Sequence, residues 1–86
     1  MSTNDHAARI PLGFMPPGKQ ACIEEIDTRI DPIQREQLAA YGLAPQRVLT
    51  VLQQHPMTIM MIDEVELALE ADIARLVWVS LFDASL

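Results

Sequence analysis

The chain is short of the residues that build cross-links, metal sites and nucleic-acid contacts. Its 86 residues include one cysteine, Cys22, so no internal disulfide can form, and a single thiol is typical of a reducing cytoplasm. Six basic residues stand against twelve acidic ones, which gives a net charge of −6. Because nucleic-acid binding depends on neutralising phosphates with Lys and Arg, we expect no nucleic-acid partner.

Long apolar runs are also absent. The longest, at residues 58–62 and 76–79, are far shorter than the roughly 20 residues needed to cross a bilayer. Residues 1–9 are polar and lack the apolar stretch of a signal peptide. We therefore expect a soluble cytoplasmic protein that does not insert into the membrane.

The sequence contains no catalytic, cofactor or metal-binding motif. His6 lies in the polar amino-terminal segment and His55 at an expected hairpin tip, and neither stands at ligand spacing from Cys22. There is no glycine-rich phosphate loop, and the acidic groups 24–27 and 63–66 lack the pattern of a calcium loop. We expect no catalytic residue, no cofactor and no metal site, and the acidic groups are interpreted as solvated surface.

Strand-length segments make up most of the chain and indicate a mostly β protein. The first contains Ala21 and Ile23 on one side, with Ile26 following after a slip of one residue, as at a bulge. The expected strands span residues 19–27, 47–53, 57–63, 65–70 and 76–80, with one helical turn at 71–75. About five antiparallel strands in this order favour a small closed β-barrel. The three strands before the helical turn are expected to form a meander. We assign residues 1–9 to a disordered tail, 10–80 to the barrel and 81–86 to an apolar carboxyl-terminal tail.

One short helix is expected between the first and second strands, from Asp31–Pro32 to about Tyr41. Asp31 can cap its first turn, with Gln34 at capping-box spacing, and Pro32 suits the first helical position. Gly42 is the residue expected in the left-handed position that ends a helix. At helical spacing, one face of this helix is shared by Ile33, Gln37, Leu38 and Tyr41.

The later strands are apolar on both faces. Period-two alternation assigns to the barrel interior Leu49, Val51, Met60, Ile62, Val77 and Val79. The opposite face, on strands expected to be neighbours, then carries Val48, Leu52, Ile59, Met61, Leu76 and Trp78. Six large apolar side chains there predict a partner interface, with Trp78 as its anchor.

Two interpretations of this apolar face remain open. It is either an interface, with a two-fold homodimer favoured over a different partner, or it is covered from within. The helix or the apolar segments that include Phe14, Leu81–Phe82 and Leu86 could supply that cover.

The spacing of core and turn residues resembles the FeoA family. The most specific pieces are Gly42–Leu43–Ala44–Pro45 after the helix and Leu67–Ala68–Leu69 before the final turn. The remaining positions of the resemblance are Leu12, Met15, Gly18, Ala21, Ile23, Ile26, Leu38, Leu49, Val51, Met60, Ile62, Ala74, Val77 and Val79. The chain departs from the family where Gln46 replaces a glycine, Gln37 an arginine and Glu70 a basic residue.

The resemblance implies an SH3-like barrel and a role in ferrous iron transport. Its implied partner is the cytosolic part of a FeoB-type membrane transporter, whose assembly or nucleotide cycle such a protein would affect by contact. The same module occurs in metal-dependent repressors, but no helix-turn-helix and no basic face accompany it in this sequence. The alternative is a self-associating SH3-like regulatory or structural module without a transporter partner.

Overall fold

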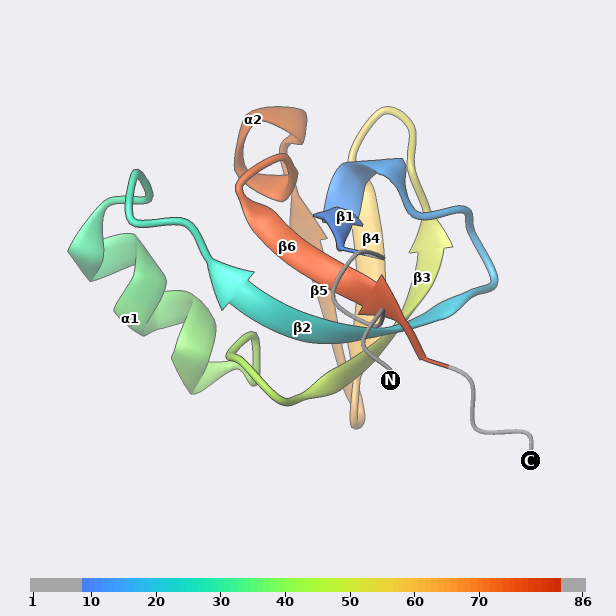
Figure 1. Ribbon diagram of the computed structural model, residues 1–86, viewed down its shortest axis with the longest axis horizontal. Helices are drawn as coiled ribbons and strands as arrows, with labels where there is room; N and C mark the ends of the chain where they lie inside the picture. The colour runs from blue at the N-terminus through green and yellow to red at the C-terminus, as the bar shows by residue number, and fades with distance from the viewer. Residues whose placement is uncertain (1–8, 83–86) are drawn as a thin grey trace, which may run out of the picture.

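Six antiparallel strands form one sheet in the computed structural model, which describes residues 9–82 (Figure 1). Residues 1–8 and 83–86, most of the two predicted tails, lie outside the described residues. The elements in chain order are β1 (Ile10–Pro11), the 3-10 turn η2 (Leu12–Phe14), β2 (Gln20–Ile26), α1 (Pro32–Ala40), β3 (Val48–Gln53), β4 (Thr58–Ile62), β5 (Val65–Leu69), α2 (Ala71–Ala74) and β6 (Val77–Leu81).

The strand order across the sheet is β1-β6-β2-β3-β4-β5, and every pairing is antiparallel. The predicted meander is confirmed, since β3 pairs with β4 and β4 with β5. The sheet is strongly curved, so that β2 and β6 cross in front of the other strands (Figure 1). The expected mostly β, SH3-like architecture with one short helix after the first long strand is therefore confirmed.

The strand count differs from the expected five because of β1. This strand has two residues, one of them a proline, and pairs with Val79 and Trp78 of β6. Two residues cannot display a period-two pattern, so the sequence carried no signal for it. At the other end of the domain β6 continues to Leu81, which the prediction had placed in the carboxyl-terminal tail.

The barrel interior follows the predicted alternation. All six residues assigned to it are buried, each with at most 1% of its surface exposed. The buried cluster is completed by Leu12, Met15, Ala21, Ile23, Ile26, Ile30, Leu43, Leu69 and Ala74. A register shift between Ile23 and Glu25 confirms the bulge in β2, which returns Ile26 to the interior.

One polar cluster ties the amino-terminal turn to the β3–β4 hairpin. The Gln54 side-chain Nε2 donates to the backbone oxygens of Leu12 at 3.0 Å and Met15 at 2.5 Å. Its Oε1 accepts from the hydroxyl of the buried Thr58 at 2.6 Å. The Gln54 amide thus joins the turn to the hairpin, and it shares the Leu12 oxygen with the backbone amide of Met15.

The face of α1 shared by Ile33, Gln37, Leu38 and Tyr41 is mostly exposed. Ile33 is 65% exposed, Tyr41 is 56% exposed, and the helix contributes no fully buried side chain. Of the predicted face, Leu38 alone among the hydrophobic residues packs against the core, and it does so partly buried. The helix is held at its two ends instead, since the buried Ile30 precedes it and the buried Leu43 follows it.

The two ends of α1 differ in how far they match expectation. Pro32 occupies the first turn as predicted, but Asp31 makes no side-chain capping bond, because the exposed first turn can be solvated by water. At the other end the amide of Gly42 donates to Ala39 and that of Leu43 to Leu38, the paired bonds of a Schellman motif. Gly42 has φ +103°, which confirms its predicted role as the helix stop.

Candidate interaction surfaces

Four of the six residues predicted to form an interface lie together on the outer side of β3 and β4. Val48 and Leu52 come from β3, and Ile59 and Met61 from β4. A register shift in β3 sets Gln53 opposite Ile59 and places Leu52 at the irregularity. Leu52 is 44% exposed and the other three are half-buried. We call these four residues the outer face.

The outer face continues onto β2 through a free thiol. Cys22 is the register partner of Val48 and is itself half-buried. Burial, with a smaller contribution from the Glu24 carboxylate, raises the pKa of this thiol. The group is therefore an uncharged, apolar neighbour of Val48 at neutral pH rather than a reactive thiolate.

Leu76 and Trp78 do not join the outer face. The prediction placed them on a neighbouring strand, but β2 separates β6 from β3, and it carries Glu24 and Glu25 between them. Trp78 lies in register with Glu25 on one side and Pro11 on the other, and Leu76 packs partly buried against the core. The sequence could not reveal this, because the alternation within a strand does not say which strands are adjacent.

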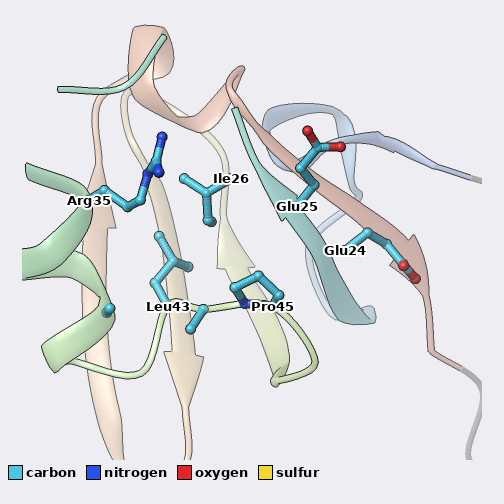
Figure 2. A pocket seen from close by; sticks show the side chains of 8 residues that line it. Glu24, Glu25, Ile26, Arg35, Leu43 and Pro45 are labelled. Atoms are coloured by element: carbon cyan, nitrogen blue, oxygen red, sulfur yellow. The ribbon is translucent and has the colours of Figure 1, made fainter. Parts of the chain in front are cut away.

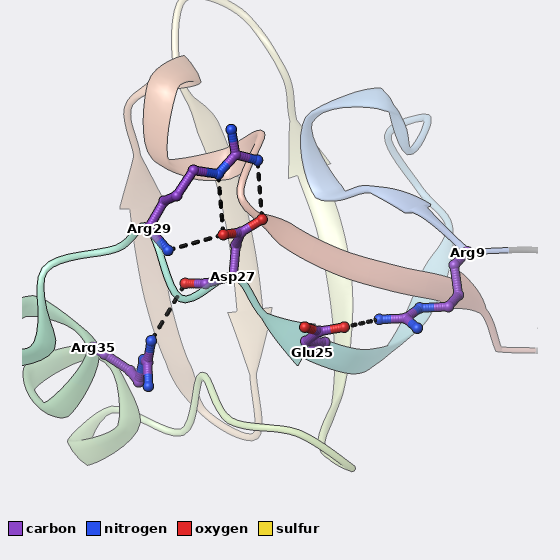
Figure 3. Close-up of polar contacts among 5 residues, drawn as sticks. All are labelled: Arg9, Glu25, Asp27, Arg29 and Arg35. Carbon is purple, nitrogen blue, oxygen red and sulfur yellow. Dashed lines mark hydrogen bonds and ion pairs between the residues drawn. The ribbon is translucent and has the colours of Figure 1, made fainter.

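Trp78 lies near a polar junction at the end of β2, centred on Asp27. Arg29 donates to its carboxylate three times, from the backbone amide at 2.9 Å and from Nε and Nη2 at 3.1 and 3.0 Å (Figure 3). These bonds, with a smaller contribution from the Trp78 side chain, hold the pKa of Asp27 far below its usual range. The backbone of Asp27 also donates to Leu76 and accepts from Arg35, so one residue joins β2, β6 and α1.

The apolar segments proposed as cover lie in solvent where the structure describes them. Phe14 is 72% exposed, Leu81 is 55% exposed, and Phe82 is also exposed. Leu86 lies outside the described residues. None of the three described side chains is withdrawn from water by folding over the sheet.

A groove between α1 and β2 was not predicted from the sequence. It has a volume of about 250 Å³, and its apolar walls come from Ile26, Ala39, Leu43, Ala44 and Pro45 (Figure 2). Arg35 of α1 lies across it from the bulged part of β2. The local sequence indicated that residues 42–45 end the helix. The same segment also forms part of the groove wall, which depends on the packing of α1 against the sheet.

Within residues 9–82 there is no group of three or more His, Cys, Asp or Glu side chains placed to hold a metal ion. Nor does any described helix combine the length and apolar character needed to cross a bilayer.

Comparison with known proteins decides the family. The sequence profile of the FeoA domain matches residues 10–81, which is most of the chain. The chain belongs to the FeoA family. Membership points to a role in ferrous iron transport, and the family is one of small accessory domains rather than of known enzymes. A search of curated protein sequences finds no significant match.

Solved structures of FeoA-type proteins share the fold. The chain is similar to an iron uptake regulatory protein, FeoA, with 26% identity and a TM-score of 0.75 over 86% of this chain and 97% of that one. A FeoA-like protein from Clostridium acetobutylicum is 12% identical, with a TM-score of 0.72 over 92% and 93% of the two chains. IdeR of T. acidophilum is 23% identical with a TM-score of 0.77, but the match spans 35% of that longer chain and shows a shared fold alone.

Proposed function

We propose that this FeoA-family protein acts in ferrous iron transport as an accessory of a FeoB-type transporter, by contact with the transporter's cytosolic part. The observation that carries the proposal is the outer face, an apolar surface on a barrel of this family. Contact there would affect the assembly of the transporter or its nucleotide cycle. The protein itself supplies no phosphate-binding loop for such a cycle.

The outer face has the character of a docking surface. Leu52 projects from the β3 irregularity beside Gln53, and Ile59 and Met61 flank it on the adjacent strand. Surface strands of a soluble barrel normally carry polar residues at such positions, and apolar clusters with polar neighbours mark interaction sites. Thr50 and Glu66, in register with Met61 from the two adjacent strands, are its polar neighbours on this surface.

The experiment compares charge substitutions at two exposed residues, Leu52 on the outer face and Ala40 on α1. The purified chain is titrated against the purified cytosolic GTP-binding domain of the FeoB-type transporter, and binding is measured by calorimetry. Leu52→Glu buries an unpaired carboxylate in the proposed interface and should abolish binding, because that burial is costly. Ala40→Glu adds the same charge at an exposed residue of α1, outside the outer face, and should retain most of the binding.

Trp78 gives a second comparison. Because β2 separates it from the outer face, Trp78→Ala should weaken transporter binding less than Leu52→Glu. The proposal fails if the wild-type chain does not bind the transporter domain or the intact transporter, or if Leu52→Glu and Ala40→Glu bind equally well.

The alternative is a self-associating barrel without a transporter partner. It is favoured by the same apolar surface, since a two-fold dimer would cover it with its own copy. Sedimentation over a range of concentrations separates the two. A dimer that Leu52→Glu dissociates, together with no transporter binding, would support the alternative.

A further inference from the structure

The two edges of the sheet differ in what they offer to a further strand. At one edge lies β1, which has two residues, one of them Pro11, a residue without a backbone N–H. At the opposite edge lies β5, which has five residues, Val65–Leu69, and in the described chain pairs with β4 alone. An edge of this length carries a row of unpaired main-chain donors and acceptors, with which another extended chain can pair.

The hairpin before β5 determines which of its residues are unpaired. Its loop is residues 63–64, and Ile62 and Val65 on either side of the loop are in register. The pair that closes a two-residue loop is hydrogen-bonded, and bonded and non-bonded pairs then alternate along the ladder. The N–H and C=O groups of Glu66 and Ala68 therefore point away from β4. Both residues are exposed, and within residues 9–82 neither makes a backbone hydrogen bond outside the strand pairings.

The side chains along this edge are acidic on one side and apolar on the other. Glu66 and Glu70 share one side by period-two alternation, Glu64 lies in the loop before the strand, and all three are exposed. Within residues 9–82 none of the three makes an ion pair. On the other side Val65 is exposed and Leu67 packs partly buried against the core. A strand added here meets carboxylates on one side and apolar side chains on the other.

A second copy of this chain does not suit the edge. In a two-fold pairing of β5 with itself, the residues that point outward lie opposite one another. The registers that pair most of the strand then bring together Glu66 with Glu66, Glu66 with Glu70, or Glu64 with Glu70. Like charges directly opposite each other on paired strands are destabilising. The same carboxylates repel an acidic strand and attract a basic one.

We propose that the β5 edge is a second interaction site, which pairs by strand addition with an extended segment of a partner protein in which basic and apolar residues alternate. The main chain of that segment bonds to Glu66 and Ala68, and its Lys or Arg side chains lie beside the glutamates. Its apolar side chains lie beside Val65 and Leu67. The inference concerns the edge alone and does not depend on the transporter.

The probe is the peptide acetyl-Lys-Val-Thr-Val-Lys-Val-Lys-amide, titrated into the isotope-labelled full chain and followed by NMR. In the antiparallel arrangement its central valine lies opposite Leu67 and the lysine after it lies opposite Glu66. We expect saturable shifts confined to β4 and β5, and slower hydrogen exchange of the Glu66 and Ala68 amides than in the free chain. Absence of saturable shifts, shifts centred elsewhere, or unchanged exchange of both amides would overturn the proposal.

Two N-methylated peptides test the main-chain pairing. N-methylation of the lysine opposite Glu66 removes a donor that is directed at β5, and should abolish binding. N-methylation of the central valine, the matched control, removes an N–H that is directed away from β5, and should leave binding nearly unchanged. Equal binding by the two peptides would show that the peptide does not add as a strand, and would overturn the proposal.

Charge reversal in the chain tests the glutamates. Glu66→Lys sets a lysine opposite a lysine of the peptide, and should weaken binding by about tenfold. Glu36→Lys makes the same change in net charge at an exposed residue of α1, outside the β5 edge, and should have a much smaller effect. Equal losses for the two variants would mean that net charge alone attracts the peptide, and would overturn the site.

Sedimentation of the free chain tests the remaining occupant. A monomer with the Glu66 and Ala68 amides in fast exchange supports the proposal. A concentration-dependent dimer in which both amides are already protected would assign the edge to a second copy, and would overturn the proposed partner segment. Since no transporter is present in these measurements, their failure and that of the proposed function are distinguishable.

Discussion

The barrel strands and the helix α1 carry the same kinds of apolar residue but place them differently, buried in the barrel and exposed on the helix. Ile23 of β2 has no exposed surface, and Ile33 of α1 is 65% exposed. The strands bury an apolar row on their inner side, whereas α1 is attached by the buried residues at its ends and by Leu38. Stability is therefore concentrated in the barrel, and α1 is free to present its surface to a partner.

This difference in burial shows at which positions of a small domain an apolar residue indicates a function. Inside the barrel, an isoleucine is explained by packing, and no further role is needed. On α1 the isoleucine side chain is mostly exposed, so packing within the described chain does not explain it. Whether it stays exposed or is covered by a partner has to be tested. Substitutions in the two regions test this contrast.

The largest effect is expected in the barrel, for Ile23→Ala. Removing a fully buried isoleucine side chain leaves a cavity among packed neighbours, and should lower the free energy of unfolding by about 2 to 5 kcal/mol. Urea denaturation followed by tryptophan fluorescence measures it. A loss below about 1 kcal/mol would show that the barrel can collapse around the cavity, and would weaken the contrast with α1.

A polar residue of the barrel should come next. Gln54→Leu removes the partner of the Met15 carbonyl and of the Thr58 hydroxyl, and one of the two donors to the Leu12 carbonyl, and should cost about 2 kcal/mol. Gln53→Leu, one residue earlier and exposed, is the control and should be nearly neutral. Comparable unfolding midpoints for the two variants would mean that water satisfies the three groups.

Gly42, where α1 meets the barrel, should show an intermediate effect. At φ +103° an alanine is strained, and its Cβ would lie 3.0 Å from Cγ2 of Ile62. Gly42→Ala should therefore cost about 1 to 2 kcal/mol. Gly18 has φ +90° with open space around it, so Gly18→Ala should cost less. If thermal unfolding shows equal losses, the contact with Ile62 contributes nothing.

The fold could be predicted from sequence wherever one face of a strand is buried. Alternation assigned Leu49, Val51, Met60 and Ile62 to the interior, because a half-buried strand repeats every two residues and any slip would expose the whole row. Gly42 could be predicted because few residues adopt its backbone conformation. The strand β1 could not, since two residues carry no period.

The surfaces could be predicted only in part. The outer face of β3 and β4 followed from alternation, but the separation of Trp78 from it depends on strand order, which joins residues far apart in the chain. Helical spacing shows which residues share a face of α1, but it does not show that this face is exposed, because the helix is anchored at its ends. The groove at Arg35 requires the relative placement of α1 and β2, and no local pattern contains that information.

The junction between the two regions should show a pH dependence. The pKa of Asp27 is depressed in the folded protein, mainly by Arg29, while an unfolded aspartate titrates near 3.9. Its stabilising contribution is therefore complete above about pH 4 and is lost as the pH falls further, because the unfolded chain binds the proton first. Asp27→Asn should lower stability at pH 7 and should flatten the decline between pH 4 and 2. Parallel stability curves for the variant and the wild type, from urea titrations at each pH, would contradict this assignment.

The smallest effect is expected on the exposed side of α1, and it completes the comparison. Ile33→Ala removes a side chain that is 65% exposed, and alanine has the higher helix propensity, so the free energy of unfolding should change by less than about 0.5 kcal/mol. Leu38→Ala, on the same helix but packed partly against the core, should cost about 1 to 2 kcal/mol. Urea denaturation of both variants measures the difference. A loss for Ile33→Ala as large as that for Leu38→Ala would mean that Ile33 is covered in solution, and a loss that grows with protein concentration would assign that cover to a second copy.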